Sequence, residues 1–132
     1  MKIAMLSSIF NSILNTIVYE NREIIGILGT TGENTINYVY IDEDAISAKY
    51  CCRLSPNVLY KMHSKSNARF VGIIHSHPPS YHSLSEADII YARRILKMSH
   101  LQFIIMGVVS DASIFLYAVF TDLIDELSLL IH

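Results

Sequence analysis

Short apolar runs alternate along this chain with segments of helical periodicity, and this alternation limits the possible folds more than any other feature of the sequence. Five runs rich in β-branched and aromatic residues have the length of strands, and one of them is apolar enough to lie centrally in a sheet. They cover residues 23–30, 35–42, 68–77, 101–109 and 113–120. The chain is therefore predicted to form an α/β (α+β) fold with a single mixed β-sheet flanked by helices.

Four further segments carry the apolar spacing or the end signals of helices. They are residues 3–19, 55–66, 85–98 and 121–132, whereas residues 43–54 fit either a loop or a short helical turn. In the second helix Ser55 is the predicted N-cap and Pro56 the first helical residue. The third helix is predicted to begin at Ser85 or Ser83, and Ser83 with Glu86 also has the spacing of a capping box.

The composition is that of a compact globular protein. Of the 132 residues 52 % are hydrophobic and 17 % are charged, which predicts one folded domain over residues 1–132. The net charge is −2 and the basic residues are scattered, so neither nucleic acid nor an anionic membrane is expected as the main partner. No apolar run reaches the ~18 residues that a membrane-spanning helix requires.

The cysteines and the N-terminal segment both bear on the expected compartment. Cys51 and Cys52 are adjacent, which is a poor geometry for a disulfide, and no other cysteine can pair with them. They lack C-x-x-C spacing, so buried structural cysteines are favoured over metal ligands. Residues 1–21 have polar residues within their apolar stretch and no convincing cleavage site, so we expect no signal peptide. Together these features predict a cytoplasmic protein.

Two histidines end the strand predicted at residues 68–77. Because residues i and i+2 of a strand point to the same face, His75 and His77 would present both imidazoles to one side. Two imidazoles placed in this way form half of a tetrahedral zinc shell. Such pairs also occur by chance, so the two histidines alone leave open both a metal site and an ordinary histidine-rich loop.

A carboxylate in the following helix favours the metal site. On the helix predicted at residues 85–98, Asp88 shares a face with Tyr91, Ala92 and Ile95, and this face should pack on the sheet. An ionised carboxylate that points inward is costly unless a cation pairs with it. A metal ion held by the two histidines would be that cation. The alternative is that Asp88 only interacts with the helix dipole, which explains an exposed aspartate better than an inward one.

The spacing of these residues resembles a known motif. His75-Ser76-His77-Pro78, six further residues and then Ser85-x-x-Asp88 resemble the JAMM motif of the MPN+ metalloproteases, H-x-H-P-x6-S-x-x-D. The family also has a glutamate on its first hairpin, commonly within E-x-x-G-x-L, which Glu23, Gly26 and Leu28 match. The resemblance spans nearly the whole chain and implies the MPN/JAMM (cytidine-deaminase-like) fold. Residues 43–54 and the last dozen residues are its least certain parts.

The resemblance also implies roles for individual residues. His75, His77 and Asp88 would bind one Zn²⁺ per chain, and Glu23 would exchange protons with the attacking water and the leaving amine. Ser85 would donate its hydroxyl to the oxyanion, although an N-cap role is an alternative that does not exclude catalysis. His82 matches no ligand position and is expected at the rim of the site.

Members of this family cut amide bonds after the C-terminal tail of ubiquitin or a ubiquitin-like protein. The chain resembles the short prokaryotic and archaeal type, which implies conjugates of ubiquitin-like or sulfur-carrier proteins as substrates. A related peptidase acting on another peptide and a non-catalytic MPN scaffold subunit are the alternatives. The apolar residues of the last predicted helix leave two interpretations open. They take part in a homodimer, or they complete the core of the single domain.

Overall fold

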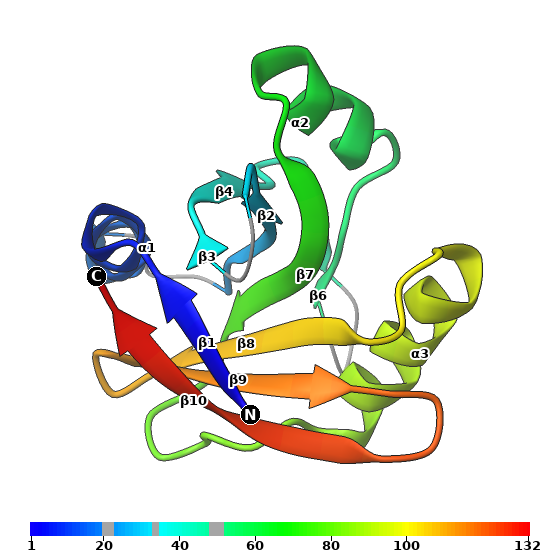
Figure 1. The fold of residues 1–132 in the computed structure, drawn as a ribbon. Helices are drawn as coiled ribbons and strands as arrows, with labels where there is room; N and C mark the ends of the chain where they lie inside the picture. Colours follow the sequence, from blue (N-terminus) through cyan, green and yellow to red (C-terminus); the bar gives the residue numbers. More distant parts are fainter. Residues whose placement is uncertain (20–22, 33–34, 48–51) are drawn as a thin grey trace.

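The computed structural model describes residues 1–19, 23–32, 35–47 and 52–132, which form three helices and ten strands (Figure 1). In chain order these are β1 (Lys2–Met5), α1 (Ser7–Tyr19), β2 (Ile25–Thr30), β3 (Thr35–Ile36), β4 (Tyr38–Ile41), β5 (Ile46–Ser47), β6 (Cys52–Arg53), α2 (Val58–Lys65), β7 (Arg69–Ser76), α3 (Glu86–Met98), β8 (Ile104–Ser110), β9 (Ser113–Val119) and β10 (Ile124–Ile131). No helix among these residues is both long and apolar enough to cross a membrane.

Eight of the strands form one sheet in the order β3-β1-β10-β9-β8-β7-β2-β4 (Figure 1). Strand β1 runs parallel to β3 and β10, and β7 runs parallel to β8, while the other neighbours are antiparallel. The predicted mixed α+β character is therefore confirmed. In the segment 43–54, β5 and β6 pair as a separate two-stranded ribbon.

The sheet is nearly closed, which differs from the predicted single sheet flanked by helices. Only Asn37 separates β3 from β4, yet β3 pairs with β1 at one edge of the sheet and β4 pairs with β2 at the other. One short stretch of chain thus links the two edges and gives the sheet a barrel-like shape. The two edge pairings connect segments far apart in the sequence, so the local pattern of apolar residues contains no sign of this closure.

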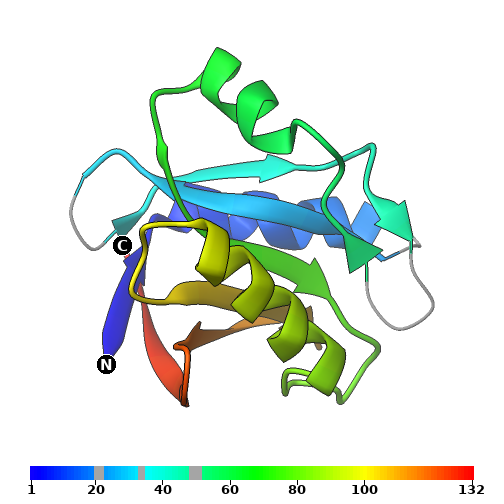
Figure 2. The same ribbon diagram turned by 90° about the vertical axis from the view of Figure 1, so that its right-hand side faces the viewer.

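Helices pack on both faces of the sheet, because apolar side chains alternate along its central strands. Ile74 and Ile105 belong to the cluster that packs with α1, whereas Ile73 and Ile104 belong to the cluster that packs with α3. Figure 2 shows α3 in front of the sheet and α1 behind it. Helix α2 covers a third, smaller cluster around Ile27. His75 follows Ile73 by two residues and therefore lies on the face that α3 covers.

The helix predicted at residues 121–132 is wrong, because this segment forms strand β10 between β1 and β9. Within β10 Leu127 is buried and Leu129 is half-buried, which is the alternation of a strand with one face on the core. Residues 124–127 pair with β9 and residues 128–131 pair with β1, and these non-local hydrogen bonds outweigh the local helical pattern. The alternative that a last helix completes the core is therefore also wrong, whereas the homodimer stays a prediction.

Two other predicted helix starts are also wrong. The first helix begins at Ser7 rather than residue 3, because residues 2–5 pair with β10 as strand β1. Helix α2 has Asn57 as its N-cap, and Ser55 instead donates its backbone N–H and its hydroxyl to the buried carboxylate of Asp42, at 2.6 and 2.8 Å. The predicted burial of Cys51 and Cys52 stays a prediction, because it concerns residues and side chains outside the described part of the structure.

Candidate metal centre

The end of β7 holds both histidines on one face of the sheet. His75 lies opposite Ile25 of β2, and beyond it the backbone N–H of Ser76 donates to the carbonyl of Ile24 at 2.9 Å. His77 follows the last residue of the strand, but its N–H still donates to the carbonyl of Val109 at 2.9 Å. Backbone hydrogen bonds to two neighbouring strands therefore fix the point from which each imidazole projects.

Helix α3 brings the carboxylate to the same place. Asp88 shares the buried stripe of α3 with Ala92 and Leu96, and only 4 % of Asp88 is exposed. Ser85 caps the helix: its hydroxyl accepts the N–H of Asp88 at 3.1 Å, and Oδ2 of Asp88 accepts the N–H of Ser85 at 2.9 Å. The capping box therefore joins Ser85 and Asp88, and the one predicted for Ser83 and Glu86 is wrong. It holds the carboxylate in one orientation before any ligand binds.

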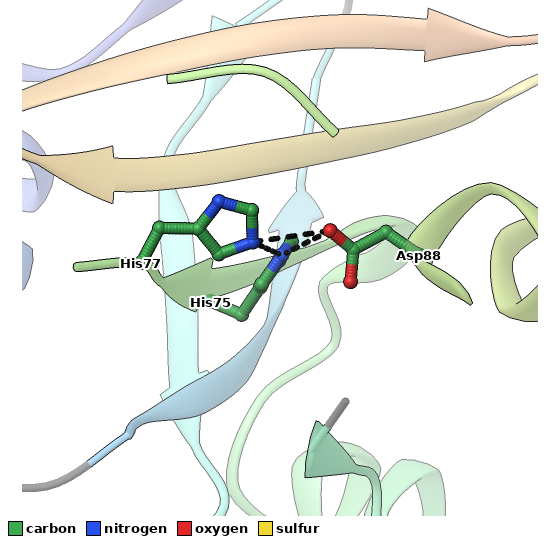
Figure 3. A group of neighbouring side chains, drawn as sticks. All are labelled: His75, His77 and Asp88. Atoms are coloured by element: carbon green, nitrogen blue, oxygen red, sulfur yellow. Dashed lines mark hydrogen bonds and ion pairs between the residues drawn. The ribbon is translucent and has the colours of Figure 1, made fainter. Parts of the chain in front are cut away.

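Three side-chain atoms from β7 and α3 meet at one point (Figure 3). Nε2 of His75 lies 2.8 Å from Nε2 of His77, and each nitrogen lies 3.1 Å from Oδ2 of Asp88. Hydrogens cannot satisfy all three contacts, because each Nε2 carries at most one and the ionised carboxylate carries none. Two protonated nitrogens would face each other, and a single unprotonated nitrogen would direct its lone pair at the carboxylate. A cation accepts all three lone pairs at once.

The triangle of ligand atoms also has about the size that a metal ion requires. Zinc–ligand distances of about 2.0–2.1 Å place the ligand atoms of a tetrahedral site roughly 3.3–3.4 Å apart. The observed separations of 2.8, 3.1 and 3.1 Å are only a few tenths of an ångström shorter. The residues therefore fit a divalent cation after a small outward movement of the side chains, and imidazole with carboxylate suits several such ions.

The electrostatics of the cluster favour positive charge. Burial raises the pKa of Asp88, but hydrogen bonds from His75 and His77 outweigh it and hold this pKa well below its usual range. The hydrogen bond to Asp88 raises the pKa of His77 above its ordinary value, against the opposing effect of burial. Both shifts have the same physical origin, because an ionised carboxylate in a partly buried site stabilises a cation beside it.

The outer nitrogens of the two imidazoles differ in their surroundings. Nδ1 of His77 lies 3.2 Å from the carbonyl oxygen of Tyr81, which can only accept a hydrogen bond. This contact favours the tautomer with the proton on Nδ1 and leaves the lone pair of Nε2 for a ligand. Nδ1 of His75 is buried and has no partner among the described residues. An unsatisfied buried group of this kind costs about 1–3 kcal/mol, a cost that functional sites tolerate.

Glu23 lies beside the cluster without joining it. Continuing the register from the pair Ile25 and His75 by two residues places Glu23 opposite His77 on the same face. The residue is exposed, and its charge contributes to the raised pKa of His77. An exposed acid next to two inward imidazoles is free to contact a bound substrate.

His82, the other histidine considered near the site, lies outside the metal-binding group. Its Nε2 pairs with Oδ2 of Asp111 at 2.6 Å, and its ring stacks on Phe115. Asp111 was not among the residues predicted from the sequence. No local pattern could have indicated it, because Asp111 follows His82 by 29 residues and contacts it only through the β8–β9 hairpin.

Two solved structures resemble the chain over nearly its whole length. The solution structure of protein DSY2949 from Desulfitobacterium hafniense has a TM-score of 0.69 at 15 % identity and covers 98 % of this chain and 92 % of that chain. The crystal structure of AF2198, a JAB1/MPN domain protein from Archaeoglobus fulgidus, has a TM-score of 0.57 at 17 % identity and 98 % coverage of both chains. No family model matches the sequence, and no curated protein matches it significantly. At these identities the likeness shows the fold alone, and it supports the expected MPN-like fold.

Proposed function

We propose that the protein is a zinc-dependent metallopeptidase of the JAMM type that hydrolyses peptide or isopeptide bonds after the C-terminal tail of ubiquitin-like or sulfur-carrier proteins. The observation that carries this proposal is the triangle of two imidazole nitrogens and one carboxylate oxygen, with sides of 2.8, 3.1 and 3.1 Å. The MPN-like fold and the spacing of the JAMM motif support it.

Zinc is the proposed cation, with one ion per chain held by His75, His77 and Asp88. Three protein ligands with a fourth position left open are the arrangement of catalytic rather than structural zinc sites. When bound, zinc acts as a Lewis acid that lowers the pKa of a bound water to about 7 and polarises a substrate carbonyl. The capping box holds the carboxylate of Asp88 in place, and the end of β7 holds both imidazoles, so contacts within the chain position all three ligands.

Glu23 is proposed as the group that moves the proton. Its carboxylate would accept a proton from the attacking water and deliver it to the leaving amine nitrogen. Its position opposite His77 and its exposure to solvent suit this role, since the group must reach both water and substrate. General acid–base assistance of this kind contributes roughly 10²–10⁴-fold to a rate.

Ser85 is proposed to donate its hydroxyl hydrogen to the oxyanion of the tetrahedral intermediate. The hydroxyl oxygen already accepts the N–H of Asp88 at 3.1 Å, so its hydrogen remains available for a second bond. The capping role and the catalytic role therefore do not conflict. Loss of one oxyanion donor lowers a rate by about 10²–10³-fold in other enzymes.

Cleavage of a ubiquitin-like protein joined through its C-terminal glycine to a lysine side chain tests the proposal. The assay compares the zinc-loaded protein, the same protein with chelator, and the variants Glu23→Gln and Glu86→Gln. Glu86 is the matched control, because it is an exposed acid in the first turn of α3 and faces away from the cluster. We expect zinc-dependent release that Glu23→Gln abolishes and Glu86→Gln preserves, with zinc bound equally by both variants.

Other outcomes separate the alternatives. Full activity of Glu23→Gln would refute the proposed proton transfer. A folded protein that binds zinc but cleaves none of several modifiers would favour a related peptidase on another peptide. A protein that purifies without metal and takes none up would favour a non-catalytic MPN scaffold.

A further inference from the structure

The loop between β7 and α3 is held against the β8–β9 hairpin by a set of specific contacts. Oδ2 of Asp111, in the turn of that hairpin, accepts the N–H of Ser80 at 3.0 Å and lies 2.6 Å from Nε2 of His82. The His82 ring stacks on Phe115 with centroids 4.2 Å apart and an angle of 15°. The hydroxyl of Tyr117 donates to the carbonyl of His82 at 2.7 Å. We call the pair His82 and Asp111 the loop anchor.

The loop anchor acts on the residue between its two attachment points. Tyr81 lies between Ser80 and His82, and both of these neighbours contact the same carboxylate oxygen. Tyr81 is 67 % exposed, so its side chain does little to hold it in place. Its backbone N–H donates to the carbonyl of Pro78 at 3.1 Å, within the same loop. The carbonyl of Tyr81 lies 3.2 Å from Nδ1 of His77. The position of this carbonyl therefore depends on that local bond together with the contacts of its two neighbours.

We propose that His82 and Asp111 are positioning residues of the metal centre, which hold the Tyr81 carbonyl where it takes the Nδ1–H of His77 and directs Nε2 at the ligand triangle. The inference rests on the proposed metal-binding function. Hydrogen bonds to the outer nitrogen of a ligating histidine set its tautomer and ring orientation. His77 needs such a partner more than His75, because His77 lies beyond the end of β7 and is half-buried, whereas His75 lies within the strand and is buried.

A purely structural role would predict a different result. The side chains of His82 and Asp111 are 42 % and 41 % exposed, and exposed ion pairs contribute little to global stability. Loss of the loop anchor should therefore change metal affinity much more than the denaturant midpoint of the metal-free protein. Loss of a contact that only packs the loop on the hairpin would change neither the metal affinity nor the hydrogen bond of the His77 Nδ1–H.

Cobalt(II) titration followed by absorption, with a competing chelator, measures the affinity without reference to hydrolysis. The variants are His82→Ala and Asp111→Asn, since asparagine tolerates the positive φ of 52° at position 111. Asp44→Asn is the matched control, because it breaks an exposed ion pair in which Oδ2 of Asp44 lies 2.7 Å from Nζ of Lys61. We expect each anchor variant to bind cobalt about 10–100-fold more weakly, and the control to stay within about twofold.

Two further measurements identify positioning as the cause. Proton and nitrogen-15 spectra of the metal-free protein should show a His77 Nδ1–H that exchanges slowly with solvent in the unaltered chain and rapidly in both anchor variants. His82→Gln keeps an N–H donor near the position of Nε2 and should recover most of the affinity. Unchanged affinity and unchanged exchange of the His77 Nδ1–H in both folded anchor variants would overturn the proposal. Absence of cobalt binding in every protein, the unaltered one included, would refute the metal centre and the loop anchor's role together.

Discussion

Replacing Asp88 by asparagine separates the two roles that the structure gives to this side chain. The carboxylate caps α3 by accepting the N–H of Ser85 at 2.9 Å, and the same oxygen forms one corner of the ligand triangle. The asparagine amide oxygen can still accept the capping hydrogen bond, but it carries no charge and ligates zinc poorly. We therefore expect Asp88→Asn to fold and to lose most of the increase in unfolding free energy that zinc binding gives.

The size of both effects can be worked out. In the metal-free protein the charge-assisted hydrogen bonds of Asp88 with Ser85 and the two imidazoles become neutral ones, a loss of about 1 kcal/mol each, and the interaction with the helix dipole costs about 0.3–1 kcal/mol more. With free zinc at about 1,000 times the dissociation constant, binding stabilises the unaltered protein by about 4 kcal/mol. Loss of a charged ligand should weaken binding by at least the roughly 100-fold that outer partners cost. The zinc increment of the variant is then at most about 1.4 kcal/mol.

Urea unfolding with and without zinc measures both quantities for each protein. The control is Asp42→Asn, because Asp42 is also a buried carboxylate that accepts three hydrogen bonds, from the N–H and the hydroxyl of Ser55 and from the N–H of Asp44. This control should lose stability in both conditions and retain the full increment of about 4 kcal/mol. An undiminished zinc increment in Asp88→Asn would refute Asp88 as a ligand, whatever its effect on stability.

Four other predictions concern pH, the helix cap and the last strand. Zinc affinity should fall as the pH is lowered through the pKa of His77, which lies above the ordinary histidine value of 6.5, because a protonated imidazole offers no lone pair to the metal. Competition titrations that give a constant zinc affinity between about pH 5.5 and 8 would contradict this. The metal-free protein should be most stable between pH 3.8 and 6.5 in urea unfolding, since the contribution of Asp88 is lost as the pH falls toward its depressed pKa and that of His77 is lost as the pH rises through its raised pKa. Ser85→Ala should destabilise the fold by about 1 kcal/mol and lower hydrolysis by about 10²–10³-fold while zinc affinity is kept, and an unchanged rate in the folded variant would leave Ser85 as a cap alone. Leu127→Ala should cost about 2–5 kcal/mol of unfolding free energy, and a cost below about 1 kcal/mol would contradict its burial in β10.

The local parts of the candidate site were predictable because short-range geometry decides them. Two residues that are two apart at a strand end share a face whatever the rest of the fold, and this applies to His75 and His77. Asp88 was placed by the helix face that it shares with Ala92, whereas the capping-box spacing was assigned to Ser83 and Glu86 and missed the box that Asp88 forms with Ser85. The strand rule, the apolar face of α3 and the spacing of the JAMM motif were sufficient to predict which three side chains meet.

The tertiary structure decided what depends on pairing between distant segments. Residues 121–132 have a pattern compatible with a helix, but residues 124–127 pair with β9 and residues 128–131 pair with β1, and this pairing made the segment a strand. The near closure of the sheet through β3 and β4, and the contact of Asp111 with His82, likewise arise from segments brought together only by folding. The sequence by itself thus determined the chemistry of the site and the elements that carry it. The shape of the sheet and the contact of Asp111 with His82 came from long-range hydrogen bonds, which no local pattern encodes.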